Sequence, residues 1–252
     1  IEYQTDGFSK RTFLDYKGKN TRDYVSGVYA VRVKYDQKNN NVSLFCYNQE
    51  GELTQDAYGV AQYYCELDAE GRRVRSIRLD EFGNRTFDTD GFFELRIKYD
   101  ANGNMIEQAT FDANGQLLNG NGNVARVKLD YDANGNIVRE SYYNAAGELT
   151  EHKKLNYSSV DYTYDANGNL TEEKYLGADG QLKANGYTDV AVIRRQYDAQ
   201  NNLTEEKYLG IDWQLTDSKH ANNFCYAIIR FKYSSDGELK KVSFYDHKER
   251  SL

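Results

Sequence analysis

The chain has 252 residues, a formal net charge of −7, a pI near 5.2 and a mean hydropathy of −0.84. The acidic balance excludes general binding to nucleic acid or anionic membrane, which needs clustered positive charge, and no stretch approaches the roughly 18 apolar residues of a membrane span. Hydrophobic residues make up 39% of the chain and include 23 Tyr and 11 Phe, so the core is expected to be thin or spread along an elongated body.

An internal repeat organises the whole chain around one anchor residue that precedes each turn signal. The anchors are Tyr3, Tyr35, Leu67, Tyr99, Tyr131, Tyr164, Tyr197 and Tyr233. Successive anchors lie 32, 32, 32, 32, 33, 33 and 36 residues apart. A period of this length is typical of a repeat architecture, and its regularity leaves no room for a separate catalytic domain.

Two turn positions recur in the repeats. Four residues after the anchor stand Gly7, Asn39, Gly71, Gly103, Gly135, Gly168, Asn201 and Gly237. Sixteen residues after it stand Gly51, Gly83, Gly115, Gly147 and Gly180, and then Trp213 in the place of a glycine. Gly and Asn tolerate the positive φ that tight hairpins need, so both positions predict turns.

The segment before each anchor alternates with period two. In 93–99 the odd-numbered residues are apolar or aromatic and the even-numbered ones are charged, as expected for a strand that is buried on one face. The second strand, typified by 170–176, is more polar. Each unit is expected to contain a strand, a turn, a second strand, a second turn and a short third strand.

The sequence therefore predicts an all-β fold, an elongated stack of β-hairpin repeats with about seven units of 32–36 residues in a single domain over 1–252. Residues 1–26 are expected to form an N-terminal partial or capping repeat without its opening strand. Residues 27–232 are expected to be regular repeats, and 233–252 a C-terminal capping segment that has lost its second turn. Stacking is required because one hairpin alone cannot bury enough surface to be stable.

Three YDANGN stretches, which begin at Tyr99, Tyr131 and Tyr164, resemble the bacterial YD-repeat (Rhs-like) family. The resemblance implies β-hairpin shells or elongated sheets on large secreted or surface proteins, including toxins, and carbohydrate binding; it supplies no catalytic residues. The unit here is longer than the usual YD unit. The second-turn segments YYNAAGEL and YLGADGQL resemble the aromatic hairpin repeats of choline-binding proteins and clostridial toxins, although those rely on abundant Trp and this chain has one.

The DANG turns have some features of a calcium loop. Asp165, Asn167 and Asn169 show the spacing of oxygen ligands, but the twelfth position, where an EF-hand needs a bidentate Glu, is Leu176. Asp and Asn in such turns bind their own backbone. We therefore expect structural turns and no metal.

Charged residues are segregated by strand. Lys and Arg gather on first strands, as in Arg96 and Lys98, and acids gather on second strands. The acids are Glu107, Glu140, Glu172, Glu173, Glu205 and Glu206. Antiparallel neighbours would place opposite charges side by side, which predicts a solvated, mutually neutralising face; a polyanion-binding stripe is the alternative.

Catalysis has little support, and no catalytic residue, metal or cofactor is predicted. His152, His220 and His247 are scattered and follow no motif. The odd count of cysteines without CxxC spacing, Cys46, Cys65 and Cys225, indicates free thiols in or near the core. A glycosidase pair among the many carboxylates stays open as an alternative.

Aromatic residues are the candidate ligand-binding residues. Tyr142, Tyr175 and Tyr208 stand eleven residues after their anchors, and rings that point outward at a repeat spacing could stack on sugars or anchor a protein; inter-hairpin packing is the alternative. Trp213 is a fourth candidate because turn chemistry does not explain it. It either is exposed and binds a ligand or is buried at a bend.

The leading hypothesis is a non-enzymatic binding or adhesion module for a glycan or protein partner, from a bacterial cell-surface or secreted protein. The first alternative is a structural spacer or shell segment that presents another domain. The second is an intracellular, cytoplasmic protein-interaction scaffold, which free cysteines would tolerate. No nucleic-acid partner and no membrane insertion are expected.

Overall fold

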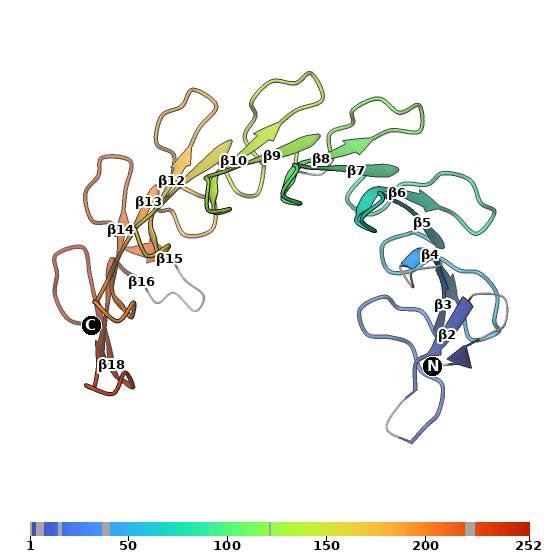
Figure 1. Cartoon of the computed structure of the whole chain (residues 1–252), viewed down its shortest axis with the longest axis horizontal. Coiled ribbons are helices and arrows are strands. Elements are labelled where there is room, and N and C mark those ends of the chain that lie inside the picture. The colour runs from blue at the N-terminus through green and yellow to red at the C-terminus, as the bar shows by residue number, and fades with distance from the viewer. Residues whose placement is uncertain (1, 4–7, 15–16, 37–40, 121, 220–224) are drawn as a thin grey trace. The chain divides into compact units, whose positions relative to one another are not determined.

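The computed structural model describes residues 2–3, 8–14, 17–36, 41–120, 122–219 and 225–252. The chain is grouped into two compact units, 1–121 and 122–252. Both units consist of antiparallel strands joined by turns and loops, with no helix among the residues described (Figure 1). The predicted all-β stack of hairpin repeats is thereby confirmed in each unit.

Unit 1 is a sheet whose strands pair in the order in which they occur in the sequence. Its strands are β1 (Glu2–Tyr3), β2 (Phe8–Thr12), β3 (Ala30–Tyr35), β4 (Asn41–Tyr47), β5 (Gln62–Leu67), β6 (Arg73–Leu79), β7 (Glu94–Tyr99) and β8 (Met105–Phe111). The prediction that the first repeat, over residues 1–26, lacks its opening strand is wrong, because the two-residue strand β1 pairs with β2.

Unit 2 has the same sequential order, and a separate two-stranded sheet, β15 with β16, lies in one of its loops. Its strands are β9 (Arg126–Tyr131), β10 (Ile137–Tyr143), β11 (Ser159–Tyr164), β12 (Leu170–Leu176), β13 (Val192–Tyr197), β14 (Leu203–Leu209), β15 (Ser218–Lys219), β16 (Cys225–Tyr226), β17 (Ile228–Tyr233) and β18 (Leu239–Tyr245).

The first turns of five described hairpins are held by the aspartate that follows the anchor, namely Asp68, Asp100, Asp132, Asp165 and Asp198. Oδ1 of Asp165 accepts hydrogen bonds from the backbone N–H groups of Asn167 and Asn169, both at 2.9 Å. Oδ2 accepts another from the Asn169 amide at 2.9 Å. Together these hydrogen bonds keep the pKa of Asp165 below its usual range. Equivalent backbone contacts recur at Asp100, Asp132 and Asp198. The DANG stretches are therefore turns whose carboxylates already bind the backbone. The predicted turn positions Gly7 and Asn39 lie outside the described residues.

The last repeat, over residues 233–252, contains its second turn, contrary to prediction. Glu249 stands sixteen residues after the anchor Tyr233 and has a φ of 57°. Its N–H donates to the Asp246 carbonyl at 2.9 Å, as in the glycine-containing turns. The predicted third strand is also wrong, because each second turn leads into one isolated bridge, such as Leu209 with Leu215.

The two faces of the unit 2 sheet differ in their cover. One, here called the loop face, carries Glu140, Tyr142, Glu173, Tyr175, Arg195, Glu206 and Tyr208, and inter-hairpin loops pack on it. Val190 from such a loop contacts Tyr208 and Ile229 in one buried cluster. The other, the turn face, carries Glu172, Arg194, Glu205, Lys207 and Arg230, and second turns pack at its margin. Leu215 after one of these turns contacts Val192 and Leu209.

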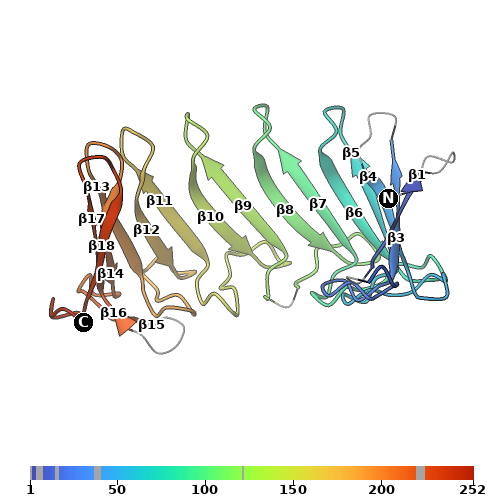
Figure 2. The same cartoon turned by 90° about the horizontal axis from the view of Figure 1, so that it is seen from below.

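Consecutive hairpins are tied together at both edges of the sheet. The first turns lie along one edge and the loops along the other within each unit (Figure 2). In unit 2 the Tyr197 hydroxyl donates to the Leu170 carbonyl of the preceding hairpin at 3.1 Å. At the loop edge the N–H of Gly186 donates to the Leu155 carbonyl at 2.7 Å. The anchor tyrosine is thus a structural tie between repeats.

The cysteines are free, as predicted, and two of the three are in the interior. Cys46 and Cys65 are buried, whereas Cys225 is exposed. Burial raises the pKa of the Cys46 thiol to about 12, with a further contribution from the Asp56 carboxylate. Cys46 is therefore a protonated core residue at neutral pH.

Candidate functional site

Trp213 occupies the second turn between β14 and the bridge at Leu215. Its φ is 63°, in the left-handed region that disfavours residues with a Cβ. The turn is closed by the Trp213 N–H, which donates to the Gly210 carbonyl at 3.1 Å. The side chain is 44% exposed, and its neighbour Ile211 is 63% exposed. The sequence left the exposure of Trp213 open, and the structure places its ring partly in solvent.

The Arg194 guanidinium lies over the Trp213 ring, 5.0 Å from its centroid. The same side chain donates from Nε to the Glu172 carboxylate at 2.7 Å. In the next hairpin Arg230 lies 4.6 Å from the Tyr245 ring, which belongs to the end of the second strand. The corresponding strand-end residue near Arg194 is Leu209, so the turn supplies the ring that the strand lacks. Cation–π contact of this kind stabilises exposed sites by about 0.5–1 kcal/mol.

The three candidate tyrosines lie on the loop face rather than beside Trp213. Tyr142 is 6% exposed and Tyr208 is 5% exposed, and Tyr175 is half-buried. The Tyr157 ring from a loop packs between Tyr142 and Tyr175, with centroids 5.8 and 4.9 Å away. These positions favour the inter-hairpin packing alternative, and among the four candidates Trp213 offers the most ring surface.

Each of these tyrosine hydroxyls donates to the glutamate two residues earlier on the same face. Tyr142 donates to Glu140 at 2.7 Å and Tyr175 to Glu173 at 3.0 Å, and Tyr208 donates to Glu206. Burial raises the pKa of Tyr142 and of Tyr208, and the adjacent carboxylates raise it further. The phenols are therefore neutral hydrogen-bond donors at neutral pH, which suits a structural role.

Arg195 joins two of these glutamates across neighbouring strands. Its Nη1 lies 2.5 Å from Glu173 and its Nε 2.6 Å from Glu206. All three side chains are mostly buried. The predicted solvated face is therefore only half right, because adjacent glutamates in a strand point to opposite faces. Glu172 and Glu205 remain on the turn face and pair with Arg194 and Arg230.

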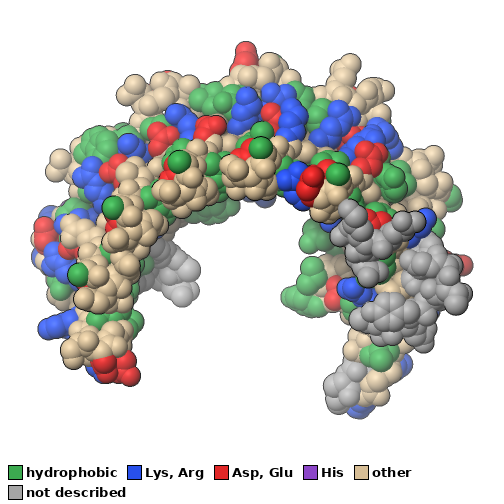
Figure 3. Space-filling view, viewed as in Figure 1, with side chains coloured by type: hydrophobic (Ala, Val, Ile, Leu, Met, Phe, Trp, Pro, Cys, Tyr) green, Lys and Arg blue, Asp and Glu red, His purple; other side chains and the backbone are tan. Residues whose placement is uncertain are grey.

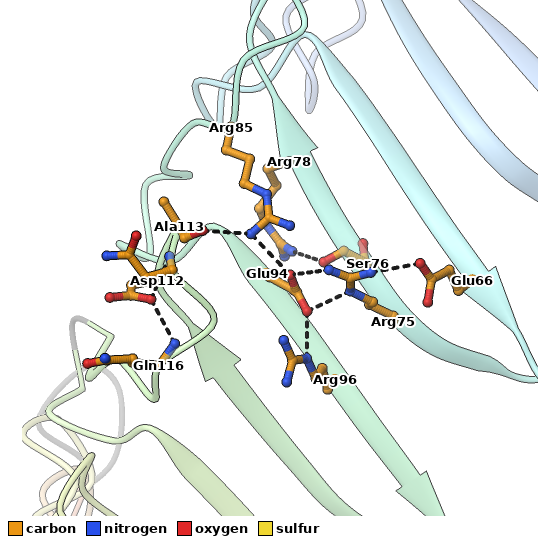
Figure 4. A network of polar contacts seen from close by, with 11 residues as sticks. Glu66, Arg75, Ser76, Arg78, Arg85, Glu94, Arg96, Asp112, Ala113 and Gln116 are labelled. Carbon is orange, nitrogen blue, oxygen red and sulfur yellow. Dashed lines mark hydrogen bonds and ion pairs between the residues drawn. The ribbon is translucent and has the colours of Figure 1, made fainter.

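Unit 1 contains a second ionic cluster, centred on Glu94 (Figure 4). The Glu94 side chain is fully buried, and its carboxylate is 2.6 Å from both Arg75 Nε and Arg96 Nε. Arg85 approaches the same carboxylate at 3.5 Å. Burial by itself would raise the pKa of Glu94, but the hydrogen bonds from Arg75 and Arg96 hold it below its usual range.

Unit 1 also has an open surface hollow of about 300 Å³ between β2, β3 and a second turn. Its lining includes Lys10 and Arg32, which face each other across the strand pair, and the amide side chains of Asn20, Asn48 and Gln49. Cationic and amide groups in a concavity suit a small anionic or polar ligand.

Sequence reasoning missed several residues that define these sites. Arg195 and Glu94 were not singled out, although period two in 203–209 could have separated Glu205 from Glu206. Tyr24 and Phe82 are more exposed than Trp213. Their positions in a loop and a second turn follow no repeat spacing that would have flagged them.

The charged surface is mixed. Basic and acidic side chains alternate over the strands on the visible face (Figure 3), and Lys98 pairs with Glu107 across one hairpin at 2.9 Å. In the described ranges no three His, Cys, Asp or Glu side chains gather as a metal site would require. Those ranges also contain no helix of the length and apolarity that a membrane crossing needs. His220 lies outside them.

No protein-family model matches the sequence, and no curated protein sequence matches it. Among solved structures, the chain is similar to a chain in the crystal structure of TcdB2-TccC3-Cdc42. That match has 13% identity and a TM-score of 0.36, and it covers 89% of this chain and 13% of that chain. It is also similar to a chain in the structure of the Photorhabdus luminescens Tc holotoxin pore, with 14% identity, a TM-score of 0.40 and coverage of 93% and 12%. This chain thus spans about an eighth of those toxin-complex chains.

Proposed function

We propose that this chain is a non-enzymatic repeat module for binding or adhesion, with a carbohydrate or protein ligand, in a bacterial cell-surface or secreted protein. The observation that supports it is Trp213, a partly exposed ring held at a left-handed turn position where five other repeats have glycine. A left-handed tryptophan costs about 1 kcal/mol relative to glycine, and such strain is typical of positions kept for a function. The cell-surface or secreted location rests on the YD-repeat resemblance.

The ring is suited to a stacking ligand. Arg194 covers part of the ring and is itself fixed by Glu172, so the tryptophan is presented in one orientation. Exposed Ile211 extends the apolar surface beside it. Sugar rings and apolar protein side chains both bind to platforms of this kind, in which an aromatic face is flanked by a hydrogen-bonding group.

A matched pair of variants tests the proposal. Trp213→Gly removes the ring and relaxes the turn, whereas Asn201→Gly relaxes the first turn of the same hairpin, where φ is also 63°, and leaves the ring in place. On a glycan array and in pull-downs with purified surface proteins, we expect Trp213→Gly to lose at least about tenfold in affinity, as hot-spot truncation does, and Asn201→Gly to bind as the parent chain does.

A structural spacer or shell segment is the second candidate. It is favoured by the buried tyrosine row and by the hydrogen bonds that tie each hairpin to the one before it. Under this function the Trp213 ring only completes the contact with Arg194. Ligand screens that stay empty, or a Trp213→Gly chain that binds as tightly as the parent, would decide for the spacer.

A further inference from the structure

Two strand junctions of unit 1 place a pair of cations at the same positions. Where β6 meets β7, Arg75 is directly opposite Arg96. Where β2 meets β3, Lys10 is directly opposite Arg32. Like charges directly opposite each other are destabilising, so a carboxylate that both cations can reach stabilises such a pair.

At the junction of β6 and β7 the chain itself supplies that carboxylate. Glu94, the first residue of β7, is fully buried and accepts hydrogen bonds from Arg75 Nε and Arg96 Nε, both at 2.6 Å (Figure 4). Arg85 approaches the same carboxylate at 3.5 Å. The Arg96 guanidinium also lies 3.9 Å from the centroid of the Phe111 ring. One carboxylate is thus held by three guanidinium groups beside an aromatic ring.

The junction of β2 and β3 has one carboxylate fewer. Where the other junction has its buried glutamate, this one has Ala30, the first residue of β3. The second acidic position is the same in both junctions. Glu2 in β1 is the register partner of Lys10, and Glu66 in β5 is the register partner of Arg75. The difference between the junctions is therefore the glutamate that became alanine.

The open hollow of about 300 Å³ lies at this position. Its lining contains counterparts of the groups around Glu94, namely Lys10 for Arg75, Arg32 for Arg96, Asn20 for Arg85 and Tyr47 for Phe111. Among the described residues that line the hollow there is no Asp or Glu. The second turn leaves room as well, because a Cβ at Gly51 would meet nothing within 4 Å, whereas a Cβ at Gly115 in the other hairpin would lie 3.5 Å from Arg96.

We propose that the hollow binds the carboxylate of a small acidic ligand between Lys10 and Arg32. The carboxylate of the ligand takes the position that Glu94 has in the other junction. Hydrogen bonds from cationic side chains to a carboxylate are roughly twice as strong as those between neutral groups. This site lies in unit 1 and does not depend on Trp213, so it goes beyond the proposed binding module.

The rest of the lining favours a sugar acid such as a hexuronate. Asn20 and Gln49 offer amide groups to hydroxyls, and Tyr47 offers a ring. Asn48 also lines the hollow, but its side chain is bonded to Glu52 within the second turn. A simple organic acid shares the carboxylate and lacks the hydroxyls, so the two sources can be separated by titration.

Titration of the full-length, ¹⁵N-labelled chain tests the site by nuclear magnetic resonance. Glucuronate should shift the amide signals of Ala30 and Gly51 in a saturable way. Its uncharged methyl ester should bind at least about tenfold more weakly, as expected when hydrogen bonds to a charged group are lost. Acetate identifies the source, because weaker binding than glucuronate indicates a sugar acid and equal affinity indicates a simple organic acid.

Variants of the full chain locate the carboxylate. Ala30→Glu gives this junction the carboxylate that the other one has, so glucuronate affinity should fall at least about tenfold. Lys10→Gln removes one cation and should weaken binding at least about fivefold. The matched control is Lys98→Gln, which removes the same charge from the exposed surface of β7 and should bind as the parent chain does.

Three results would overturn the proposal. The first is a parent chain that binds neither glucuronate nor acetate, and the second is a methyl ester that binds as tightly as the acid. The third is unchanged affinity in both Ala30→Glu and Lys10→Gln. Retained glucuronate binding in Trp213→Gly keeps this test separate from that of the binding module.

Discussion

Unit 1 and unit 2 each contain an ionic cluster, and the charges at the centres of the two clusters have opposite signs. In unit 1 a fully buried carboxylate, Glu94, is surrounded by Arg75, Arg96 and Arg85. In unit 2 a mostly buried guanidinium, Arg195, lies between Glu173 and Glu206. Both clusters cross the junction between hairpins, so each links neighbouring repeats. The difference teaches that buried charges can meet at different positions of the repeat and with either sign, because Glu94 is the first residue of its strand and Arg195 the fourth residue of its own.

The largest expected effect is at Glu94. Glu94→Gln should lower the free energy of unfolding by about 3 kcal/mol, because removal of the fully buried carboxylate takes away the counter-charge that Arg75, Arg85 and Arg96 share. Urea unfolding followed by circular dichroism measures it. The control is Glu107→Gln, which breaks a pair with the exposed Lys98 and should cost less than about 1 kcal/mol. Equal losses of unfolding free energy in the two variants would show that the burial of Glu94 is not the cause of the effect.

Arg195→Met comes second, with an expected loss of about 2 kcal/mol from two carboxylates left unpaired. The loss is smaller than at Glu94 because each of the two carboxylates keeps a hydrogen bond from a tyrosine hydroxyl. Urea unfolding again measures it. The matched control is Arg194→Met, on the exposed face of the same strand. If that control is as costly as Arg195→Met, burial is not the cause.

Acid should remove the contribution of Glu94 to the free energy of unfolding. The pKa of Glu94 is lowered in the folded chain from its ordinary value of 4.5. Its contribution to stability is therefore complete above about pH 4.5 and is lost as pH falls through the folded pKa. The fall in unfolding free energy from pH 7 to pH 3 should be smaller in Glu94→Gln than in the parent. Parallel pH profiles for the two chains would contradict this assignment.

The smallest expected effect concerns the hydrogen bond that the anchor tyrosine makes to the preceding hairpin in both units. The hydroxyl of Tyr99 in unit 1 donates to the Arg73 carbonyl at 3.1 Å, and that of Tyr197 in unit 2 donates to Leu170 at 3.1 Å. Tyr99→Phe and Tyr197→Phe should each cost about 0.5–1.5 kcal/mol, the net value of one hydrogen bond. Thermal unfolding of both variants measures it. A loss in one unit alone would show that the tie is not a general feature of the repeat.

The features predicted correctly from sequence are those decided within a few residues. Alternation in 93–99 located β7. The DANG pattern located the first turns, because Asp165 accepts hydrogen bonds from the backbone of its own turn and Gly168 adopts the positive φ that the turn needs. Failures arose where local signals were absent. Glu249 adopts a turn conformation that its residue type does not favour, and the bridge at Leu215 was mistaken for a strand.

The candidate site was predicted less well. Trp213 was selected because it replaces a turn glycine, and the structure places it partly in solvent, where a ligand could reach it. Tyr142 and Tyr208 carried the same repeat signal, but they are covered by loop residues such as Tyr157 and Tyr226. Periodicity shows that two residues share a face of a strand; it does not show what covers that face.

The linear sequence was sufficient for the 32–33-residue period, the strands and the hairpin turns, since each depends on contacts between residues close together in the chain. The burial of Glu94 and the burial of Arg195 follow from pairing between different hairpins. These contacts join residues such as Arg75 and Glu94, or Glu173 and Arg195, that are 19 and 22 positions apart. Their energy depends on burial and on the partner's charge, and both come into being only when one repeat packs against the next.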